Sequence, residues 1–174
     1  SLINDLLDLS SLDNGIELQK TAVNTRELTD RVIAHLEPRR VEKKTAVTVE
    51  CDASVVLADS IRLEQVLVNL LENAMKYGPE GGTIRVRWEK RDGQTALMVM
   101  DNGRGILPEH QARLFERFYR IDKARSRELG GTGLGLAIVK HIMQVHGGTV
   151  TVQSEVGKGA EFTCLFPDQL SSVE

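Results

Sequence analysis

The clearest pattern in the chain is a run of apolar residues that recur every three or four positions between Asp59 and Tyr77. This spacing is typical of a helix that turns one face toward a hydrophobic core. The apolar residues that make up this pattern are Ile61, Leu63, Val66, Leu67, Leu70, Leu71, Ala74 and Met75. We expect Asp59 or Ser60 to cap this helix, and Gly78-Pro79 to end it.

Three polar residues share one side of this predicted helix. Asn69 and Asn73 are four positions apart and Lys76 follows three later, so their side chains lie one above another. Asparagine is a mediocre helix former, so two asparagines on the same face of a helix need an explanation. One interpretation is functional: two amide oxygens could hold a hard cation, with an ammonium near the phosphates that the cation carries. The other is a polar stripe at the edge of a buried face.

Four further segments have helical patterns. They span residues 1–10, 24–44, 108–115 and 134–146. The first is short for a lone helix and is interpreted as the tail of a longer one. In the second, Asn24 and Glu27 fit a capping box, and we expect the helix to continue to about Lys44 despite Pro38.

Alternation of apolar and polar residues, the mark of a half-buried strand, predicts strands over residues 45–51 and 83–89. Further strands are expected over residues 16–18, 54–58, 95–100, 149–154 and 161–166. The strand at 95–100 is apolar on both faces, so we expect it to be central in its sheet. Residues 117–132 have no clear periodicity and are rich in Arg, Lys and Gly, which predicts a mobile functional loop.

Composition narrows the classes of function. The net charge of −3 argues against a nucleic-acid-binding protein, and no apolar run is long enough to span a bilayer, so we expect no direct membrane contact by this chain. Cys51 and Cys164 are far apart in strand-like surroundings, which favours two buried thiols over a disulfide or a metal pair. The chain opens on Ser1 without an initiator methionine, so we interpret it as a piece of a larger protein.

Two glycine clusters are candidate ligand sites. Asp101-x-Gly103-x-Gly105 follows a buried strand, where a fixed carboxylate could accept a hydrogen bond from an exocyclic amine such as that of adenine. The alternative is an ordinary turn. Residues 130–135 (Gly-Gly-Thr-Gly-Leu-Gly) open a helix, whose free N–H groups suit phosphate, although the spacing is neither that of the P-loop nor that of the dinucleotide fingerprint. The alternative here is a glycine-rich hinge.

Together and in this order, these motifs closely resemble the ATP-binding catalytic domain of bacterial sensor histidine kinases. That family belongs with the ATPase domains of gyrase, mismatch-repair and heat-shock chaperone proteins. The resemblance covers roughly residues 25–167. It rests on residues 65–77 (the N box), Asp101, Gly103 and Gly105 (G1), 115–120 (the F box), 131–135 (G2) and, more loosely, 157–159 (G3). Residues 2–10 resemble the end of the second helix of the family's dimerisation and phosphotransfer hairpin.

The resemblance implies an α+β fold, a two-layer α/β sandwich of the Bergerat type. Its mixed, mostly antiparallel sheet of about five strands carries three helices on one face. ATP would lie under a flexible lid, residues 103–133. The implied division of the chain is 1–16 for the end of the hairpin with a linker, 17–170 for the catalytic domain and 171–174 for a tail.

The resemblance also implies the roles of individual residues. Asn73 would ligand Mg²⁺ with help from Asn69. Lys76 and Arg120 would contact phosphate oxygens and, with Asn73, carry catalysis, while Asp101 would read the adenine amine. The other nucleotide contacts that it implies are Tyr77, Gly103, Gly105, Ile106, Tyr119, Gly131, Thr132, Gly133, Leu134, Gly135 and Leu136.

One departure within the superfamily bears on the reaction. The ATPase members carry a glutamate where Asn69 stands, and that glutamate activates water. An amide cannot take up a proton at neutral pH, so this site suits phosphoryl transfer rather than hydrolysis. Glu72 lies about 100° round the helix from Asn73 and is a poor substitute for a hydrolytic base.

The phosphate acceptor of the family is a histidine followed by an acidic residue on the first hairpin helix. None of His35, His110, His141 and His146 is followed by an acidic residue, so each is interpreted as a surface or helix-end histidine. The expected partners are therefore the parent protein's own hairpin, which would form a homodimer, and the receiver domain of a response regulator. The implied location is a cytoplasmic domain of a parent anchored in the cell membrane.

Three alternatives stay open. The first is a superfamily ATPase that hydrolyses ATP, which measurable steady-state hydrolysis would support. The second is a serine protein kinase of the same fold, which transfer to a protein serine would support. The third is a degenerate docking module, which a failure to bind any nucleotide would favour. Asparagine in place of glutamate at position 69 argues against the ATPase, and the complete set of motifs argues against the docking module.

Overall fold

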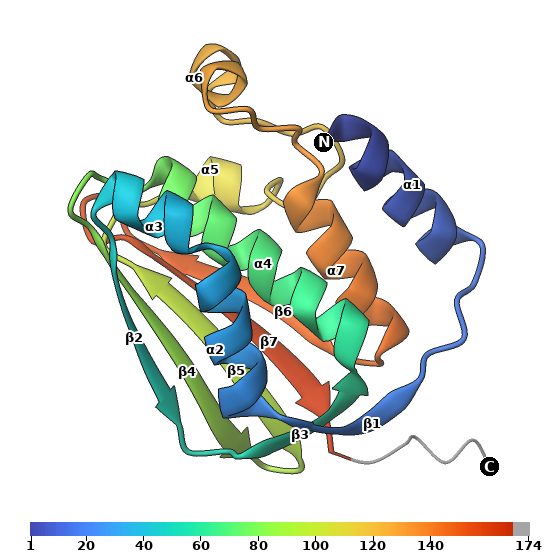
Figure 1. Ribbon diagram of the computed structural model, residues 1–174. Helices are drawn as coiled ribbons and strands as arrows, with labels where there is room; N and C mark the ends of the chain where they lie inside the picture. The colour runs from blue at the N-terminus through green and yellow to red at the C-terminus, as the bar shows by residue number, and fades with distance from the viewer. Residues whose placement is uncertain (169–174) are drawn as a thin grey trace.

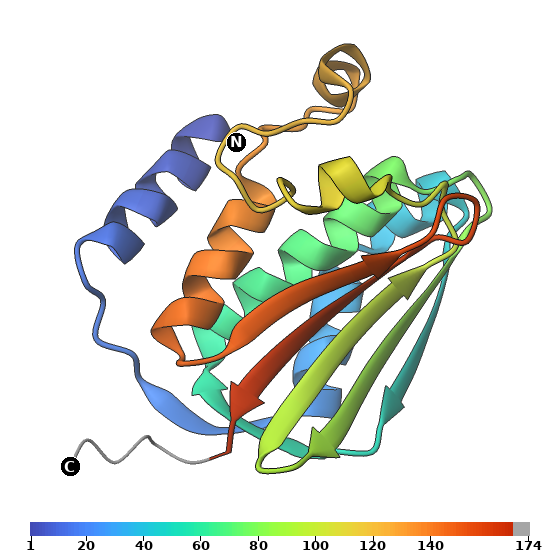
Figure 2. The same ribbon diagram turned by 180° about the vertical axis from the view of Figure 1, so that it is seen from behind.

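The computed structural model describes residues 1–168, so the tail expected at 171–174 lies outside the described residues. Helices cover one face of a twisted sheet (Figure 1), and the strands lie in front when the molecule is turned round (Figure 2). The helices are α1 (Leu2–Asp13), α2 (Thr25–His35), α3 (Glu37–Lys43), α4 (Ser60–Tyr77), α5 (Pro108–Gln111), α6 (Lys123–Glu128) and α7 (Gly135–Val145). The strands are β1 (Lys20–Asn24), β2 (Ala46–Cys51), β3 (Val55–Asp59), β4 (Thr83–Arg91), β5 (Gln94–Asp101), β6 (Thr149–Ser154) and β7 (Ala160–Pro167).

The main sheet has five strands in the order β2-β4-β5-β7-β6. β2 and β4 are parallel, and the other neighbours are antiparallel. Parallel neighbours need a long crossover, which here contains α4. β5 is central, as its two apolar faces predict. β1 and β3 form a separate antiparallel pair. The predicted α+β class with a mixed five-stranded sheet is therefore confirmed.

Helix α4 lies at the centre of the helical layer. Asp59 caps it by accepting hydrogen bonds at Oδ1 from the N–H groups of Ile61 (3.1 Å) and Arg62 (3.2 Å). The predicted apolar face is buried, and Leu63, Val66, Leu67 and Leu71 have no exposed area. Ile61 is the exception, at 75% exposed. It lies at the margin of the apolar stripe, because Gln65 and Val68, on its own side of the helix, are only half-buried.

Two predicted elements near the N-terminus are wrong. The helix expected over 24–44 is two helices that break at Leu36, because in one continuous helix the ring of Pro38 would clash with the carbonyl of Ala34. The strand expected at 16–18 is absent, and the first strand begins at Lys20. Its partner β3 ends opposite Lys20, at Asp59, so residues 16–18 have no strand to pair with.

Two predictions around the lid also need correction. The helix expected over 108–115 ends at Gln111 and continues as turns. Residues 117–132, predicted to lack regular structure, contain α6, which Asp122 caps by accepting a hydrogen bond from the N–H of Arg125 (3.1 Å). α6 projects away from the body of the molecule (Figure 1). A six-residue helix is too short to produce a periodic signal in the sequence.

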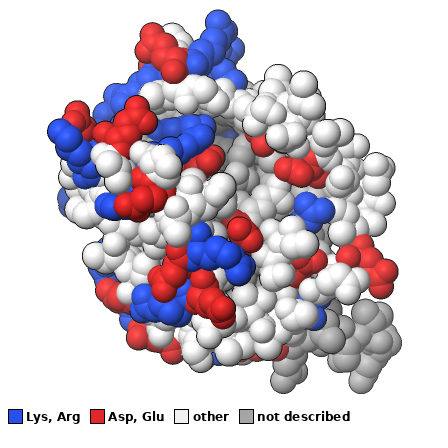
Figure 3. All heavy atoms as spheres, viewed as in Figure 1, with Lys and Arg blue, Asp and Glu red and all other residues white. Residues whose placement is uncertain are grey.

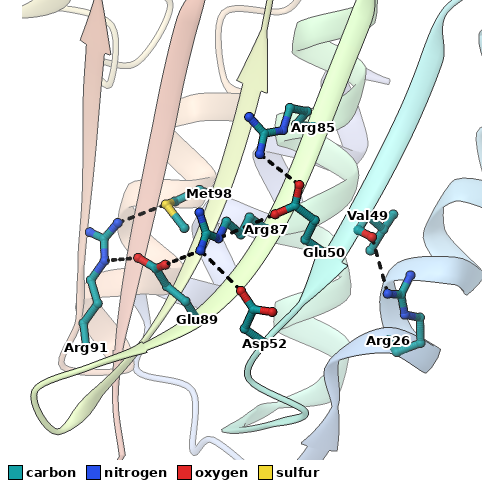
Figure 4. Close-up of polar contacts among 9 residues, drawn as sticks. All are labelled: Arg26, Val49, Glu50, Asp52, Arg85, Arg87, Glu89, Arg91 and Met98. Atoms are coloured by element: carbon teal, nitrogen blue, oxygen red, sulfur yellow. Dashed lines mark hydrogen bonds and ion pairs between the residues drawn. The ribbon is translucent and has the colours of Figure 1, made fainter.

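The sheet face opposite the helices carries ion pairs instead of a second layer (Figure 4). Arg87 lies between Asp52 and Glu89, each 3.3 Å from its Nη2 atom, and Arg85 bonds Glu50 at 2.9 Å. Exposed pairs of this kind contribute at most about 1 kcal/mol each. On the helix face, side chains of both signs are interspersed (Figure 3), so this face has no large field of one sign.

Burial distinguishes the two cysteines. Cys164 is fully buried, and burial raises the pKa of its thiol to about 12. Cys51 is only half-buried, contrary to the expectation that both would be buried, and both are free thiols.

Within residues 1–168, no helix combines the length and the apolarity that a bilayer crossing requires.

Candidate active site

A cleft of about 610 Å³ opens between α4, the lid and the start of α7. The sequence-predicted residues that line it are Asn69, Asn73, Lys76, Tyr77, Asp101, Gly103, Gly105, Ile106, Tyr119, Arg120, Gly131, Thr132, Gly133, Gly135 and Leu136. Leu134 does not line it, because its side chain is fully buried in the core. Positions separated by up to 67 residues in the chain thus converge on one cavity, which is the arrangement expected of a ligand site.

One wall of the cleft is the polar side of α4. Asn69, Asn73 and Lys76 all face the cavity, while the opposite side of the helix is packed in the core. The Nδ2 atom of Asn69 donates a hydrogen bond to the carbonyl of Gly135, at 3.3 Å. This contact joins the asparagine stripe to the first residue of α7.

Asp101 stands at the end of the central strand β5, where it lines the cleft. Burial raises the pKa of its carboxyl, while hydrogen bonds from the N–H groups of Gly103 and Ala160 act in the opposite direction. The bond from Gly103 to Oδ1 is 2.8 Å long. A carboxylate fixed by backbone donors keeps one orientation, so it can select a ligand whose hydrogen-bond donor lies at the matching position.

The loop after Asp101 is supported from behind by the turn between β6 and β7. Gly157 donates a hydrogen bond to the carbonyl of Arg104, at 2.7 Å. At Gly159, φ is +80° and an added Cβ atom would lie 1.9 Å from the carbonyl oxygen of Asp101. Only glycine allows this approach of two backbones. The motif at 157–159, the loosest in the sequence, thus has a definite structural role.

The lid is closed at its base by a backbone contact. The N–H of Phe118 donates to the carbonyl of Gly133 at 2.9 Å, and Phe118 adopts a left-handed φ of 66°. Within the lid, Ser126 on α6 is 2% exposed, and its hydroxyl bonds the hydroxyl of Tyr77 at 3.0 Å. Sequence reasoning missed Ser126, because no local signal marks a serine that contacts a helix 49 positions away.

His110 is a second residue of the cleft that the sequence did not indicate. Its Nδ1 atom forms a short hydrogen bond with the hydroxyl of Tyr119, and the guanidinium of Arg113 lies 4.5 Å from the centre of the Tyr119 ring. Both contacts fix Tyr119, and its neighbour Arg120 also lines the cleft. In the sequence, His110 has only the features of a surface or helix-end histidine, and nothing near it indicates a ligand.

Glu72 and Arg39 also line the cleft and were not predicted to do so. Arg39, on α3, lies 3.5 Å from the carboxylate of Glu72 in an ion pair. Glu72 thus reaches the cavity, although its position round the helix from Asn73 suggested otherwise.

The four histidines lie outside any helical hairpin. His35 ends α2, His110 lies in α5 and His141 lies in α7. His146 is at the end of α7 but is 2% exposed, so the expectation of a helix-end residue holds and that of a surface residue does not. Its Nε2 accepts from the N–H of Asp59 (3.1 Å), and burial lowers its pKa.

A sequence profile described as "Histidine kinase-, DNA gyrase B-, and HSP90-like ATPase" matches residues 58–170, more than half of the chain. The chain belongs to this family. The matched range contains the asparagine helix, both glycine clusters and the lid, so the resemblance indicated by the motifs is confirmed. Membership of this family indicates ATP as the ligand of the chain.

Similar proteins in the family are sensor kinases. The chain is 36% identical over 169 residues to the sensor-like histidine kinase SenX3 of Mycolicibacterium smegmatis. The alignment covers 96% of this chain and 44% of that protein. The chain superposes on full-length ShkA in complex with AMPPNP with a TM-score of 0.85 at 34% identity, covering 98% of this chain and 36% of that one. It also superposes on the histidine kinase ThkA in complex with the response regulator TrrA, with a TM-score of 0.74 at 25% identity, covering 96% of this chain and 49% of that one. The chain thus spans less than half the length of each of these proteins.

Proposed function

We propose that the chain is the ATP-binding catalytic domain of a two-component sensor histidine kinase, which transfers the γ-phosphoryl group of ATP to a histidine. The observation that carries this proposal is the cleft, in which Asn69, Asn73 and Lys76 converge with Asp101. The names of its relatives support the same reaction. The ATPase and serine-kinase alternatives would use the same cavity differently and are separated by the experiment below.

The cleft has two chemically different ends for ATP. The carboxylate of Asp101 would accept a hydrogen bond from the adenine amine, and Ile106 would line the base pocket. At the other end, the start of α7 offers backbone N–H groups and the positive end of a helix dipole. Leu134 supplies no side-chain cap there. Lys76 and Arg120 would add positive charge for the phosphate oxygens.

The donor set also fits Mg²⁺. Amide oxygens are hard, neutral ligands of the kind that this ion accepts, and Asn73 would hold it with help from Asn69. When bound, the ion supplies positive charge that offsets the charge on the transferring group. The chain's own part is to hold the phosphates in line for attack, with the lid excluding water.

Two features favour transfer to a protein over hydrolysis. An amide at position 69 cannot accept a proton from water at neutral pH. Glu72, which also lines the cleft, is held in an ion pair with Arg39 at 3.5 Å and lies about 100° round the helix from Asn73. The attacking group would therefore have to come from outside the cleft.

The acceptor that we propose is a histidine on the dimerisation hairpin of the whole protein, which would be a homodimer. None of the four histidines of this chain has the acidic neighbour of the family motif. Relay to a response-regulator receiver domain is supported by the complex of the relative ThkA with TrrA. Anchoring of the parent in the cell membrane belongs to the same proposal, since the relatives are sensors.

Transfer in trans tests this function. The chain is mixed with γ-labelled Mg-ATP and the full-length protein carrying Asn73→Ala, which keeps its acceptor but should not phosphorylate itself. We expect acid-labile, base-stable label on the full-length variant only when the chain is present. Label released as inorganic phosphate would indicate an ATPase, acid-stable label would indicate a serine kinase, and either result would overturn the proposal.

A further inference from the structure

Helix α1 contacts both ends of the lid segment 117–132. Arg117 donates two hydrogen bonds from Nη2 to the carboxylate of Asp13, at 2.8 and 3.0 Å. At the other end, the hydroxyl of Thr132 donates to Oδ2 of Asp5, at 2.7 Å. Figures 1 and 2 agree that α1 lies beside α7, with the N-terminus next to the segment that joins α6 to α7. Leu9 and Leu12 anchor the helix in the core.

The carboxylate of Asp5 lies at the phosphate end of the cleft. Asp5 lines the same cavity as Lys76, Arg120 and the glycine segment. Thr132, its partner, also accepts a hydrogen bond from the N–H of Leu134 at 3.2 Å, at the very start of α7. Leu134 supplies no side-chain cap to α7, and Asp5, through Thr132, brings a negative charge to the end of the helix that the dipole makes positive.

We propose that Asp5 is a specificity-determining residue that disfavours nucleoside triphosphates over diphosphates while α1 is docked. The inference rests on the proposed function, because it takes residues 131–135 as the phosphate site. A hydroxyl has one hydrogen to donate, so Thr132 cannot serve Asp5 and a phosphate oxygen together. A triphosphate brings more negative charge to this end than a diphosphate, and like charges in a half-buried site repel strongly.

The competition couples nucleotide to the position of α1. A triphosphate that displaces Asp5 from Thr132 removes one of the two hydrogen-bonded links between α1 and residues 117–132, and Asp13–Arg117 is left as the other. By linkage, docking of α1 weakens the triphosphate by the same factor as the triphosphate weakens docking. A diphosphate leaves the Asp5–Thr132 contact in place. Helix α1 would thus respond to the nucleotide that the cleft holds.

The substitution Asp5→Asn removes the charge and keeps an oxygen that can accept from Thr132. We expect it to tighten binding of a non-hydrolysable ATP analogue by roughly three- to tenfold and to change ADP affinity less than about twofold. Asp8→Asn is the matched control, because Asp8 is on the same helix and accepts from Gln65 on α4 at 2.7 Å, outside the cleft. Calorimetry measures the affinities of the wild type and of both variants for the ATP analogue and for ADP.

Hydrogen exchange of the α1 amides in the wild-type chain is the second readout. The analogue should accelerate their exchange and ADP should not. An unchanged ratio of ATP-analogue to ADP affinity in Asp5→Asn, or an equal change in Asp8→Asn, would overturn the inference. Failure of the wild type to bind ADP at all would instead contradict the proposed function, so the two failures are distinguishable.

Discussion

Replacing Asn73 with alanine should abolish Mg-dependent binding of ATP by this chain, with an affinity loss of at least about 100-fold. Asn73 is the amide on α4 that lies between Asn69 and Lys76 in the cleft, one turn from each. Alanine is a good helix former, so the helix should persist while the proposed magnesium ligand is removed. Displacement of a fluorescent nucleotide by ATP, with and without Mg²⁺, measures the loss.

The control for this variant is Glu64→Ala, on the same helix but outside the cleft. Glu64 is 40% exposed at its side chain and pairs with Arg31 at 3.7 Å, a contact of the kind that contributes little. It should bind nucleotide like the wild type. An Asn73→Ala protein that binds Mg-ATP as tightly as the wild type would show that the ion is held by other residues.

Gly159→Ala should damage both the fold and the nucleotide site. The new methyl group would lie 1.9 Å from the carbonyl oxygen of Asp101, so the two backbones must move apart. We expect a loss of about 3 kcal/mol in the free energy of unfolding, together with weakened nucleotide binding, because Asp101 is the residue displaced. Chemical denaturation measures the first effect and calorimetry with ADP measures the second.

Gly157→Ala is the matched control two residues earlier. Gly157 also has a left-handed φ, +84°, but nothing lies within 4 Å of an added Cβ atom. Its cost should be the conformational strain alone, about 1 to 2 kcal/mol, with nucleotide affinity retained. If the two variants are equally destabilised and bind alike, the close approach at Gly159 does not support Asp101.

The periodic helix α4, the alternating strand β4 and the continuously apolar strand β5 could be predicted from sequence because their signal is local. The helix buries one face, β4 buries every second residue and β5 is buried on both faces, so the spacing of apolar residues reflects the packing directly. The break at Leu36 has a local cause too, because the ring of Pro38 would clash with the carbonyl of Ala34 in a continuous helix. The strand expected at 16–18 failed because pairing depends on where β3 ends, which no local pattern records.

The candidate site was predicted as a set of motifs but not as a set of contacts. Asn73, Asp101 and the glycines carry unusual residue types at telling positions, so they could be recognised. Ser126 and Arg39 act through contacts with Tyr77 and Glu72 that only the folded chain creates. The docking of α1 is of the same kind, since Asp5 and Thr132 are 127 positions apart.

The central claim, that the cleft holds Mg-ATP, is tested most directly by a calorimetric titration of this chain. ADP and a non-hydrolysable ATP analogue are each titrated with and without Mg²⁺. The account predicts micromolar binding of both, with affinity for the triphosphate that falls sharply when Mg²⁺ is removed. Absence of binding by either nucleotide, or triphosphate binding that is indifferent to Mg²⁺, would contradict it.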